Sequence, residues 1–380
     1  MRRKRLHPVR NRTVLKLFGI IAPIFTWIFS ALFPGRKASV LASECRNKCN
    51  IMALVQNLQS YMDPEGKTTL QSIVEKCYAL GNFPALWAVE GVGKDLAEWH
   101  IARNPNPQRI LIDAQLDPKW DGAWLMLHAG LGLGFAKYHY DNLKSESDAD
   151  VRAAVRNTVR LCLENSRPGY CGAAVESLGL VTRFMKNTKF CLRVHQILTE
   201  DAPDAVGFYW RGMGRSAYFH PINFAPGFIR PARCINICAN QAPNPQLKEA
   251  MMSGVAWAQT IVNMTDPRVM EWVLENHDDY FSGSAGWFNG VISSVVMRYD
   301  TTPGEPLIER FLNHQPDPKN RTLCGLWNSK IKGSLDTALK TVYPVLKKHQ
   351  RLDEVFRYQS LPALAARLET QQAAPLGKTM

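Results

Sequence analysis

The sequence predicts a mainly α protein built around a sizeable core. Of its 380 residues, 46% are hydrophobic and 21% are charged, a balance that excludes disorder as the main state. Amphipathic helical periodicity runs through 148–164, 268–275 and 334–350, whereas alternating β-branched runs are scarce. Two apolar stretches, 123–137 and 251–263, carry glycine or alanine every few positions, so we expect central helices that approach their neighbours closely.

The positive charge of the chain is concentrated at its N-terminus. The formal net charge is +13, yet residues 1–37 hold nine basic residues and no acidic one. The remaining 343 residues carry 37 basic and 33 acidic side chains and are therefore nearly neutral. A nucleic-acid-binding face needs a basic surface, so we expect no nucleic-acid partner.

A run of 17 uncharged residues, Leu17–Phe33, follows the basic leader and indicates a membrane-related segment. This length is at the lower limit for crossing a hydrocarbon core, and Pro23 interrupts it. A cleaved signal peptide ending near Ala42, a signal anchor that exports the body, and an interfacial helix are the competing interpretations. We favour an interfacial or shallow anchor that leaves the body in the cytoplasm, with the arginines on anionic head groups. A buried first helix is the structural alternative.

Cysteine usage agrees with a cytoplasmic body and indicates no metal site. The nine cysteines are an odd number without a dense framework, which favours reduced thiols. The pairs Cys45/Cys49 and Cys234/Cys238 lack the spacing of a zinc site and a nearby histidine partner. The segment Gly91–Lys94 looks like the end of a phosphate loop but lacks the first glycine and the final serine or threonine. We therefore expect no metal and no cofactor.

Internal repetition is the most informative feature of the body. Three short segments rich in small and aromatic residues recur in the same order, at offsets of 121, 124 and 111 residues. The pairs are 88–94 with 209–215, 128–134 with 252–258, and 171–179 with 282–290. We infer two tandem helical repeats that form one pseudo-symmetric domain. Chance recurrence of small-residue helix patterns is the alternative.

This repetition defines the expected domain organisation. The segments are 1–37 (basic leader and apolar membrane anchor), 38–65 (connecting helix), 66–190 (first helical repeat), 191–300 (second helical repeat), 301–370 (C-terminal helical extension) and 371–380 (flexible tail). The expected fold is thus mainly α, with an N-terminal membrane-binding helix ahead of the two repeats.

Several glycine-rich motifs carry a resemblance to a known family. They are Arg211–Phe219, Ser253–Ala258, the Gly91/Gly93 element after Glu90, and Leu17–Ile20 near the start. Over most of residues 17–300 the chain resembles the domain of unknown function typified by the UnbL proteins of enediyne polyketide gene clusters. The resemblance implies a bacterial-type accessory protein of a secondary-metabolite pathway that makes a long unsaturated carbon chain. It implies no established reaction and carries over no catalytic residue.

Three residues are candidates for catalytic groups. Glu90 and Arg211 occupy equivalent positions in the two repeats, so a pseudo-twofold axis would bring them to a shared interior. A buried structural ion pair is the alternative. His128, on a glycine-rich apolar segment, is a candidate proton donor or acceptor, and a hydrogen-bonded core histidine is its alternative.

Five further residues are candidates for ligand binding. Lys94 and Arg215 each follow a Gly-x-Gly element and would suit an anionic group, although solvated cations at helix ends have the same pattern. The aromatic residues Trp87, Trp210 and Trp257 lie in or beside the repeated elements. They fit a wall that holds an extended apolar or cationic guest, and ordinary core packing would also explain them.

Two classes of function follow from these features. The first is a membrane-associated accessory or tailoring protein that binds a lipophilic polyene-like or isoprenoid intermediate in an apolar helical cavity, with acid–base or cyclisation chemistry as an extension. Its partners would be the lipophilic small molecule and a membrane surface. The second is a non-catalytic scaffold subunit of a membrane-bound complex, with membrane-protein partners. The sequence leaves open whether the protein is an enzyme.

Overall fold

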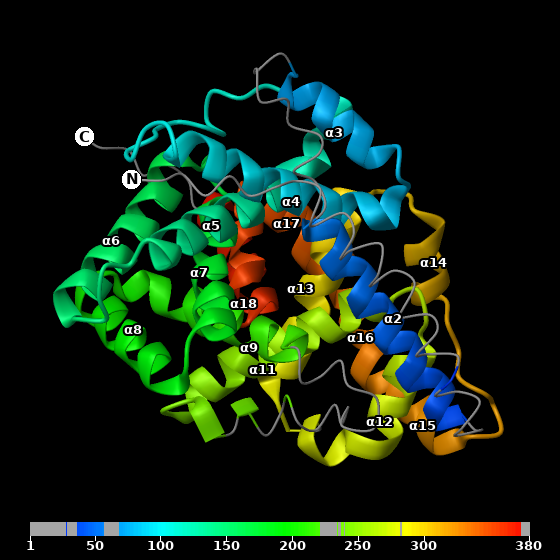
Figure 1. Ribbon diagram of the computed structural model, residues 1–380. Helices are drawn as coiled ribbons and strands as arrows, with labels where there is room; N and C mark the ends of the chain where they lie inside the picture. Colours follow the sequence, from blue (N-terminus) through cyan, green and yellow to red (C-terminus); the bar gives the residue numbers. More distant parts are fainter. Residues whose placement is uncertain are drawn as a thin grey trace, which may run out of the picture.

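The structure is a computed structural model that describes residues 36–56, 68–220, 240–281 and 283–373, together with Ile28, Cys234, Ile237 and Cys238. In these residues all regular structure is helical and no strand occurs (Figure 1), which confirms the mainly α prediction. The expected membrane anchor, Leu17–Phe33, lies outside the described residues except for Ile28. Among the helices that are described, none is both long and apolar enough to cross a membrane.

The helical elements follow one another along the chain. The first group comprises α2 (Arg36–Gln56), α3 (Leu70–Tyr78), α4 (Asn82–Ile101), η2 (Pro118–Ala123), α5 (Trp124–Asp141), α6 (Asp148–Asn165), α7 (Cys171–Met185), α8 (Thr188–Asp201), η3 (Pro203–Ala205) and α9 (Val206–Phe219). The second group comprises α11 (Pro245–Asn263), α12 (Arg268–Phe281), α13 (Ala285–Thr301), α14 (Pro306–Leu312), α15 (Arg321–Leu326), η5 (Trp327–Lys332), α16 (Gly333–Thr337), η6 (Ala338–Val342), α17 (Tyr343–Lys348), η7 (Leu352–Phe356) and α18 (Leu361–Ala373).

Capping side chains define where several helices begin. Ser147, just before α6, accepts a hydrogen bond from the N–H of Asp150 at 3.2 Å. Asn244, just before α11, accepts one from the N–H of Leu247 at 2.9 Å. Each bond satisfies one of the amide groups that a helix start leaves without an intrahelical partner. The expected helix 148–164 accordingly appears as α6.

The expected amphipathic helix 334–350 contains a change of helix type in the structure. The chain from Arg321 to Lys348 consists of short α-helical segments that alternate with two π-helical turns, η5 and η6. Pro344, two residues after the end of η6, has no N–H to donate to the backbone ladder of this turn, so the hydrogen-bond pattern changes near this point. The helical prediction for 334–350 is confirmed up to Lys348, and hydrophobic periodicity does not reveal the π-helical turn η6 within it.

The core is a series of six helices, α4, α5, α7, α9, α11 and α13, each packed against the next. Helices α6 and α8 cover α5, α7 and α9 from outside, and α12 packs on α2 and α11. In Figure 1, α6 and α8 lie on the left of the molecule and α14 and α15 on the right, with α17 and α18 near the middle. The C-terminal part reaches the series through η7, which contacts α7, α9 and α13.

Glycines allow α4 and α5 to lie in direct backbone contact. A Cβ atom added to Gly130 of α5 would lie 1.9 Å from the carbonyl oxygen of Glu90 in α4. One added to Gly93 of α4 would lie 2.1 Å from the carbonyl oxygen of Leu127 in α5. These distances leave no room for a side chain, so both positions require glycine.

The contact between α9 and α11 is built in the same way. A Cβ atom at Gly214 of α9 would lie 1.9 Å from the carbonyl oxygen of Met251, and one at Gly254 of α11 would lie 2.0 Å from that of Arg211. These four residues follow the four of the α4–α5 contact by 121 positions in α9 and 124 in α11. The two contacts therefore use positions that the first two sequence pairs align.

The third sequence pair is placed differently. Gly179 of α7 approaches the carbonyl oxygen of Tyr209 in α9, whereas Gly290 of α13 approaches that of Ser253 in α11. One glycine therefore faces the next helix of the series and the other faces the preceding one. The two-repeat architecture as a whole stays a prediction.

We expect Gly130→Ala to lower the free energy of unfolding by about 2–3 kcal/mol, because its methyl group would overlap the Glu90 carbonyl oxygen. Gly325→Ala in α15 is the matched control, since nothing lies within 4 Å of a Cβ atom there. In a helix this second change should be neutral or stabilising by up to about 1 kcal/mol. Urea unfolding followed by circular dichroism measures both, and equal stabilities would contradict the close packing of α4 on α5.

Candidate functional site

A cluster of four charged side chains lies in the interior of the helix series. Glu90 of α4, Glu176 of α7, and Arg211 and Arg215 of α9 are all at most 3% exposed. Arg211 Nη1 donates to Glu176 Oε1 at 3.1 Å, and Arg215 Nη1 donates to Glu176 Oε2 at 3.2 Å. Arg215 Nη2 also donates to Glu90 Oε1. Arg215 therefore joins the two glutamates, and we call these four residues the charge cluster.

The geometry of α9 brings the charge cluster together. Arg211 and Arg215 are four residues apart and so lie on the same face of the helix. Gly212, between them, lets α7 approach so closely that an added Cβ atom would lie 2.1 Å from the carbonyl oxygen of Glu176. The glycine contacts thus place a carboxylate within reach of both guanidinium groups. Ser293 of α13 accepts a further hydrogen bond from Arg211 Nη2 at 3.3 Å.

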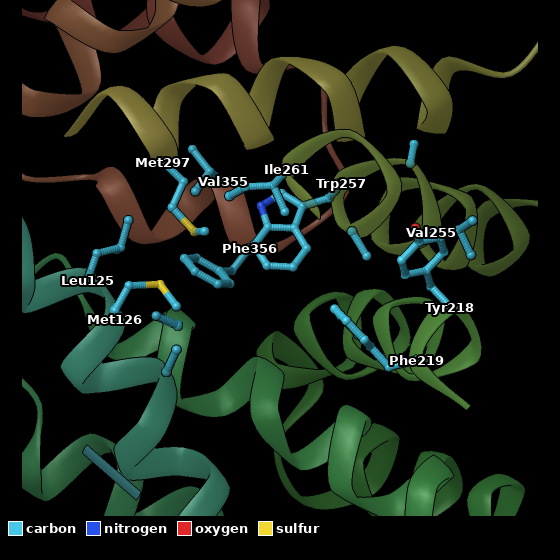
Figure 2. Close-up of a cluster of buried hydrophobic side chains, with 14 of the residues drawn as sticks. Leu125, Met126, Tyr218, Phe219, Val255, Trp257, Ile261, Met297, Val355 and Phe356 are labelled. Atoms are coloured by element: carbon cyan, nitrogen blue, oxygen red, sulfur yellow. The ribbon is translucent and has the colours of Figure 1, made fainter. Parts of the chain in front are cut away.

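Aromatic rings enclose the two arginines of the charge cluster. The Trp257 ring of α11 lies 5.2 Å from Arg211 Cζ and 4.9 Å from Arg215 Cζ, within range of a cation–π contact. The Phe356 ring of η7 lies 5.1 Å from Arg211 Cζ. Figure 2 shows the Trp257 and Phe356 rings beside one another, at a centroid distance of 6.4 Å. The arginines are thus enclosed by apolar faces as well as by carboxylates.

Burial and pairing act against each other on the charges of the cluster. Burial raises the pKa of Glu90, and the Arg215 charge opposes this rise. Burial lowers the pKa of Arg211 to about 10, with Glu176 opposing, so Arg211 remains charged at neutral pH. For Arg215, burial alone would lower the pKa, but the Glu90 and Glu176 charges outweigh it and raise the pKa. Two positive and two negative groups leave the charge cluster without net charge.

Four N–H groups at the charge cluster lack a hydrogen-bond acceptor among the described residues. They are Arg211 Nε, Arg215 Nε, Trp87 Nε1 and Trp257 Nε1. The Trp87 and Trp257 rings meet edge to face at 6.5 Å, so the indole and guanidinium donors share one region. A buried donor without an acceptor costs about 1–3 kcal/mol. Oxygen atoms of a guest placed here would remove that cost.

A second group of buried polar side chains holds α2 against the series. Tyr218 of α9 donates to Glu44 Oε1 at 2.6 Å, and Asn263 Nδ2 of α11 donates to the Tyr218 hydroxyl at 2.9 Å. Lys48 pairs with Glu44 at 3.1 Å and lies 3.9 Å from the centre of the Tyr218 ring. Glu44 and Lys48 are each 1% exposed, so this pair too is buried and balanced in charge. Sequence reasoning missed both residues.

Glu90 and Arg211, which the sequence placed in a shared interior, both belong to the charge cluster. They do not bond to each other: Glu90 bonds to Arg215, and Arg211 bonds to Glu176. Glu176 was missed by sequence reasoning. The sequence feature that could have identified Glu176 is that it is the one charged residue between Cys171 and Thr182, in a helix of otherwise small and apolar residues.

His128 lies outside the charge cluster and is bonded to the backbone. Its Nδ1 lies 2.6 Å from the carbonyl oxygen of Trp124, and its Nε2 accepts from the N–H of Arg167 at 3.0 Å. Because a carbonyl can only accept, the proton is on Nδ1 and the ring is neutral. Burial lowers the pKa of His128 to about 3. This is the bonding of a core histidine, the alternative that the sequence also allowed.

The remaining predicted ligand residues have different environments. Lys94 pairs with Asp95 at 3.1 Å and Glu98 at 3.2 Å on its own helix, whereas Arg215 joins the charge cluster. Trp210 donates to His195 Nδ1 of α8 at 3.2 Å, so its indole N–H has an acceptor. Trp87 and Trp257 lie at the charge cluster, as described above.

The described part of the chain contains no group of three or more His, Cys, Asp or Glu side chains that could hold a metal ion. The nine cysteines are thiols and are not joined in disulfide bonds. No protein-family model, curated protein or solved structure matches this chain.

We expect Glu176→Gln to destabilise the protein more than Glu90→Gln does. The first change leaves Arg211 without a carboxylate and should cost about 3–5 kcal/mol, whereas the second leaves Arg215 bonded to Glu176 and should cost about 1–3 kcal/mol. Exposed Glu369 of α18 provides the control, for which Glu369→Gln should change stability by less than about 0.5 kcal/mol. Chemical unfolding measures all three, and an inverted order would refute the assigned pairing.

His128 should make the protein sensitive to acid. Its pKa is about 3 when folded against an ordinary value of 6.5, so its contribution to stability is complete above pH 6.5 and declines as pH falls towards 3. The decline is about 1.4 kcal/mol per pH unit. We expect His128→Gln to remove this part of the slope, while the same change at the partly exposed His195 leaves most of it. Identical slopes in stability–pH curves of the parent and His128→Gln would contradict the assignment.

Proposed function

We propose that the protein binds a lipophilic molecule of polyene or isoprenoid type between its central helices, with the charge cluster as the polar part of the binding site. The observation that carries this proposal is the set of four buried N–H donors without acceptors beside the Trp87 and Trp257 rings. Binding sites for small molecules combine apolar and aromatic walls with a few polar groups that orient the ligand. The interior around Trp257 has this composition.

We further propose that the protein associates with a membrane and that the ligand undergoes acid–base or cyclisation chemistry in the site. A lipophilic ligand would reach the protein from a bilayer, which agrees with residues 1–37 acting as a membrane-surface anchor for a cytoplasmic body. The role as an accessory or tailoring protein of a secondary-metabolite pathway rests on the family resemblance. For acid–base or cyclisation chemistry, Glu90 is the candidate proton acceptor, as a buried carboxylate bonded to Arg215.

The two-repeat architecture belongs to the same proposal. The glycine contacts of α4 with α5 and of α9 with α11 support it, because they use aligned positions. Two related halves would enclose a ligand between them, with Glu90 from one half and Arg211 and Arg215 from the other. The different neighbours of Gly179 and Gly290 limit the similarity to one helix contact in each half, that of α4 with α5 and that of α9 with α11.

A non-catalytic scaffold is the second candidate function. One observation favours it: each charge of the cluster is paired within the cluster, which is sufficient to lock α4, α7 and α9 together without any ligand. The surface of such a scaffold would then bind membrane-protein partners, and the interior would serve stability alone.

Retinol, a polyene alcohol of isoprenoid origin, is the probe for the proposed function. We expect saturable binding to the full chain, measured by quenching of tryptophan fluorescence. Trp257→Phe keeps an aromatic ring but removes one N–H donor, and it should weaken binding about fivefold, the equivalent of one hydrogen bond worth about 1 kcal/mol.

Trp210→Phe is the matched control for the retinol titration. It also exchanges a fully buried indole for a phenyl ring, but its N–H bonds to His195 away from the charge cluster. Retinol affinity should be unchanged in this variant, with melting temperatures recorded on the same samples. Absence of saturable binding in the unaltered protein, or equal losses in both variants, would favour the scaffold.

A further inference from the structure

We propose that the natural ligand is electrically neutral and carries oxygen acceptors, as an aldehyde, ketone, ester, ether or alcohol does, and that fatty-acid anions and isoprenoid diphosphates are excluded. This inference rests on the proposed function and specifies its ligand class. It follows from two features of the interior: the unpartnered polar atoms on one aromatic path are all donors, and the charges along that path are already balanced.

Arg298 extends the set of donors to the C-terminal end of α13. Its side chain is fully buried, and its Nη2 donates to Glu305 Oε2 at 2.8 Å. Its Nε and Nη1 have no acceptor among the residues that the structure describes. Burial lowers the pKa of Arg298 to about 10, so the group is still charged at neutral pH. The Phe83 ring of α4 lies 5.1 Å from Arg298 Cζ.

Aromatic contacts connect Arg298 with the charge cluster. The Phe83 ring meets the Trp87 ring at 6.5 Å, and the Trp87 ring meets the Trp257 ring at 6.5 Å. Trp257 in turn contacts both arginines of the charge cluster. Six unpartnered N–H groups lie along this aromatic path: Arg298 Nε and Nη1, Trp87 Nε1, Trp257 Nε1, Arg211 Nε and Arg215 Nε. A ligand on the path must supply acceptors at several points.

The charge on the path decides between a neutral and an ionised ligand. Arg298 is paired with Glu305, and the two arginines of the charge cluster are paired with two glutamates. A carboxylate or diphosphate added to this region would be an uncompensated negative charge among arginine and tryptophan side chains that are at most 3% exposed. The free energy needed to desolvate such an ion is larger than the free energy gained from its hydrogen bonds to the guanidinium groups, because carboxylates already neutralise those groups. A carbonyl or ether oxygen accepts the same hydrogen bonds at no such cost.

A cationic ligand is excluded by the same geometry. An ammonium group donates hydrogen bonds and accepts none, so it would face N–H groups that also only donate. The aromatic faces of the path are already shared with guanidinium groups. The aromatic residues in the sequence were compatible with either an apolar or a cationic guest. The donors around them favour a neutral ligand that accepts hydrogen bonds.

A retinoid series that shares one polyene chain tests the inference. Retinal, methyl retinoate, retinoic acid and the oxygen-free hydrocarbon of the same skeleton are titrated into the full chain at pH 8, with tryptophan quenching as the readout. We expect retinal and methyl retinoate to bind at least tenfold (about 1.4 kcal/mol) more tightly than either the hydrocarbon or the acid. The dissociation constant of the acid should fall about tenfold per pH unit as pH is lowered towards its pKa, while that of the ester stays constant.

The second test uses Glu305→Gln, which should strengthen the binding of retinoate. Because this change leaves Arg298 with an uncompensated positive charge, retinoate should bind about tenfold more tightly to the variant at pH 8, with methyl retinoate unchanged. The retinoid series on the unaltered protein keeps the inference testable even if this variant fails to fold.

The outcomes separate this inference from the proposed function. Binding of retinoate as tight as that of the methyl ester and independent of pH would overturn the neutral-ligand inference and leave the proposed function standing. Equal binding of the hydrocarbon and the aldehyde would overturn the role of the donors. If no retinoid binds to the unaltered protein, the proposed function fails and the inference fails with it.

Discussion

The close approach of the central helices is the constraint on which the rest of the structure depends. At Gly130 and Gly254 the backbone of one helix touches a carbonyl oxygen of the preceding helix in the series, so no side chain fits at these positions. Packing at this distance gives many van der Waals contacts and recovers the helix propensity that glycine loses. It also fixes how neighbouring helices are aligned along their axes, because a shift would place a side chain against a carbonyl group.

This alignment places the buried charges. Glu176 reaches Arg211 and Arg215 because Gly212 lets α7 lie against α9 at that level. Four buried ions are tolerated only where each has a partner of opposite charge. The charge cluster therefore acts on the fold in return: it opposes any sliding of α4, α7 or α9 that would separate a glutamate from its arginine.

Pairing of opposite charges recurs at three places in the interior and has a consequence for the proposed ligand. Lys48 with Glu44 under α2 and Arg298 with Glu305 at the end of α13 repeat the pairing of the charge cluster. Along the aromatic path the charges are paired, but several N–H groups still lack a hydrogen-bond acceptor. A neutral, oxygen-bearing lipophilic ligand is the class of molecule that meets this condition, and a segment that touches a membrane would give access to it.

The sequence by itself determined the helical class and the close-packed glycine helices, since periodicity and small residues are local properties of the chain. It also singled out Glu90, Arg211 and Arg215, which lie in the buried charge cluster. Hydrophobic periodicity did not reveal the π-helical turn η6, where the backbone hydrogen-bond pattern changes without a break in the helix. Only the tertiary structure decided that Glu90 pairs with Arg215 and that Glu176 completes the charge cluster. Pairing across three helices depends on their axial alignment and spacing, and these arise from packing between segments far apart in the sequence, which no local pattern records.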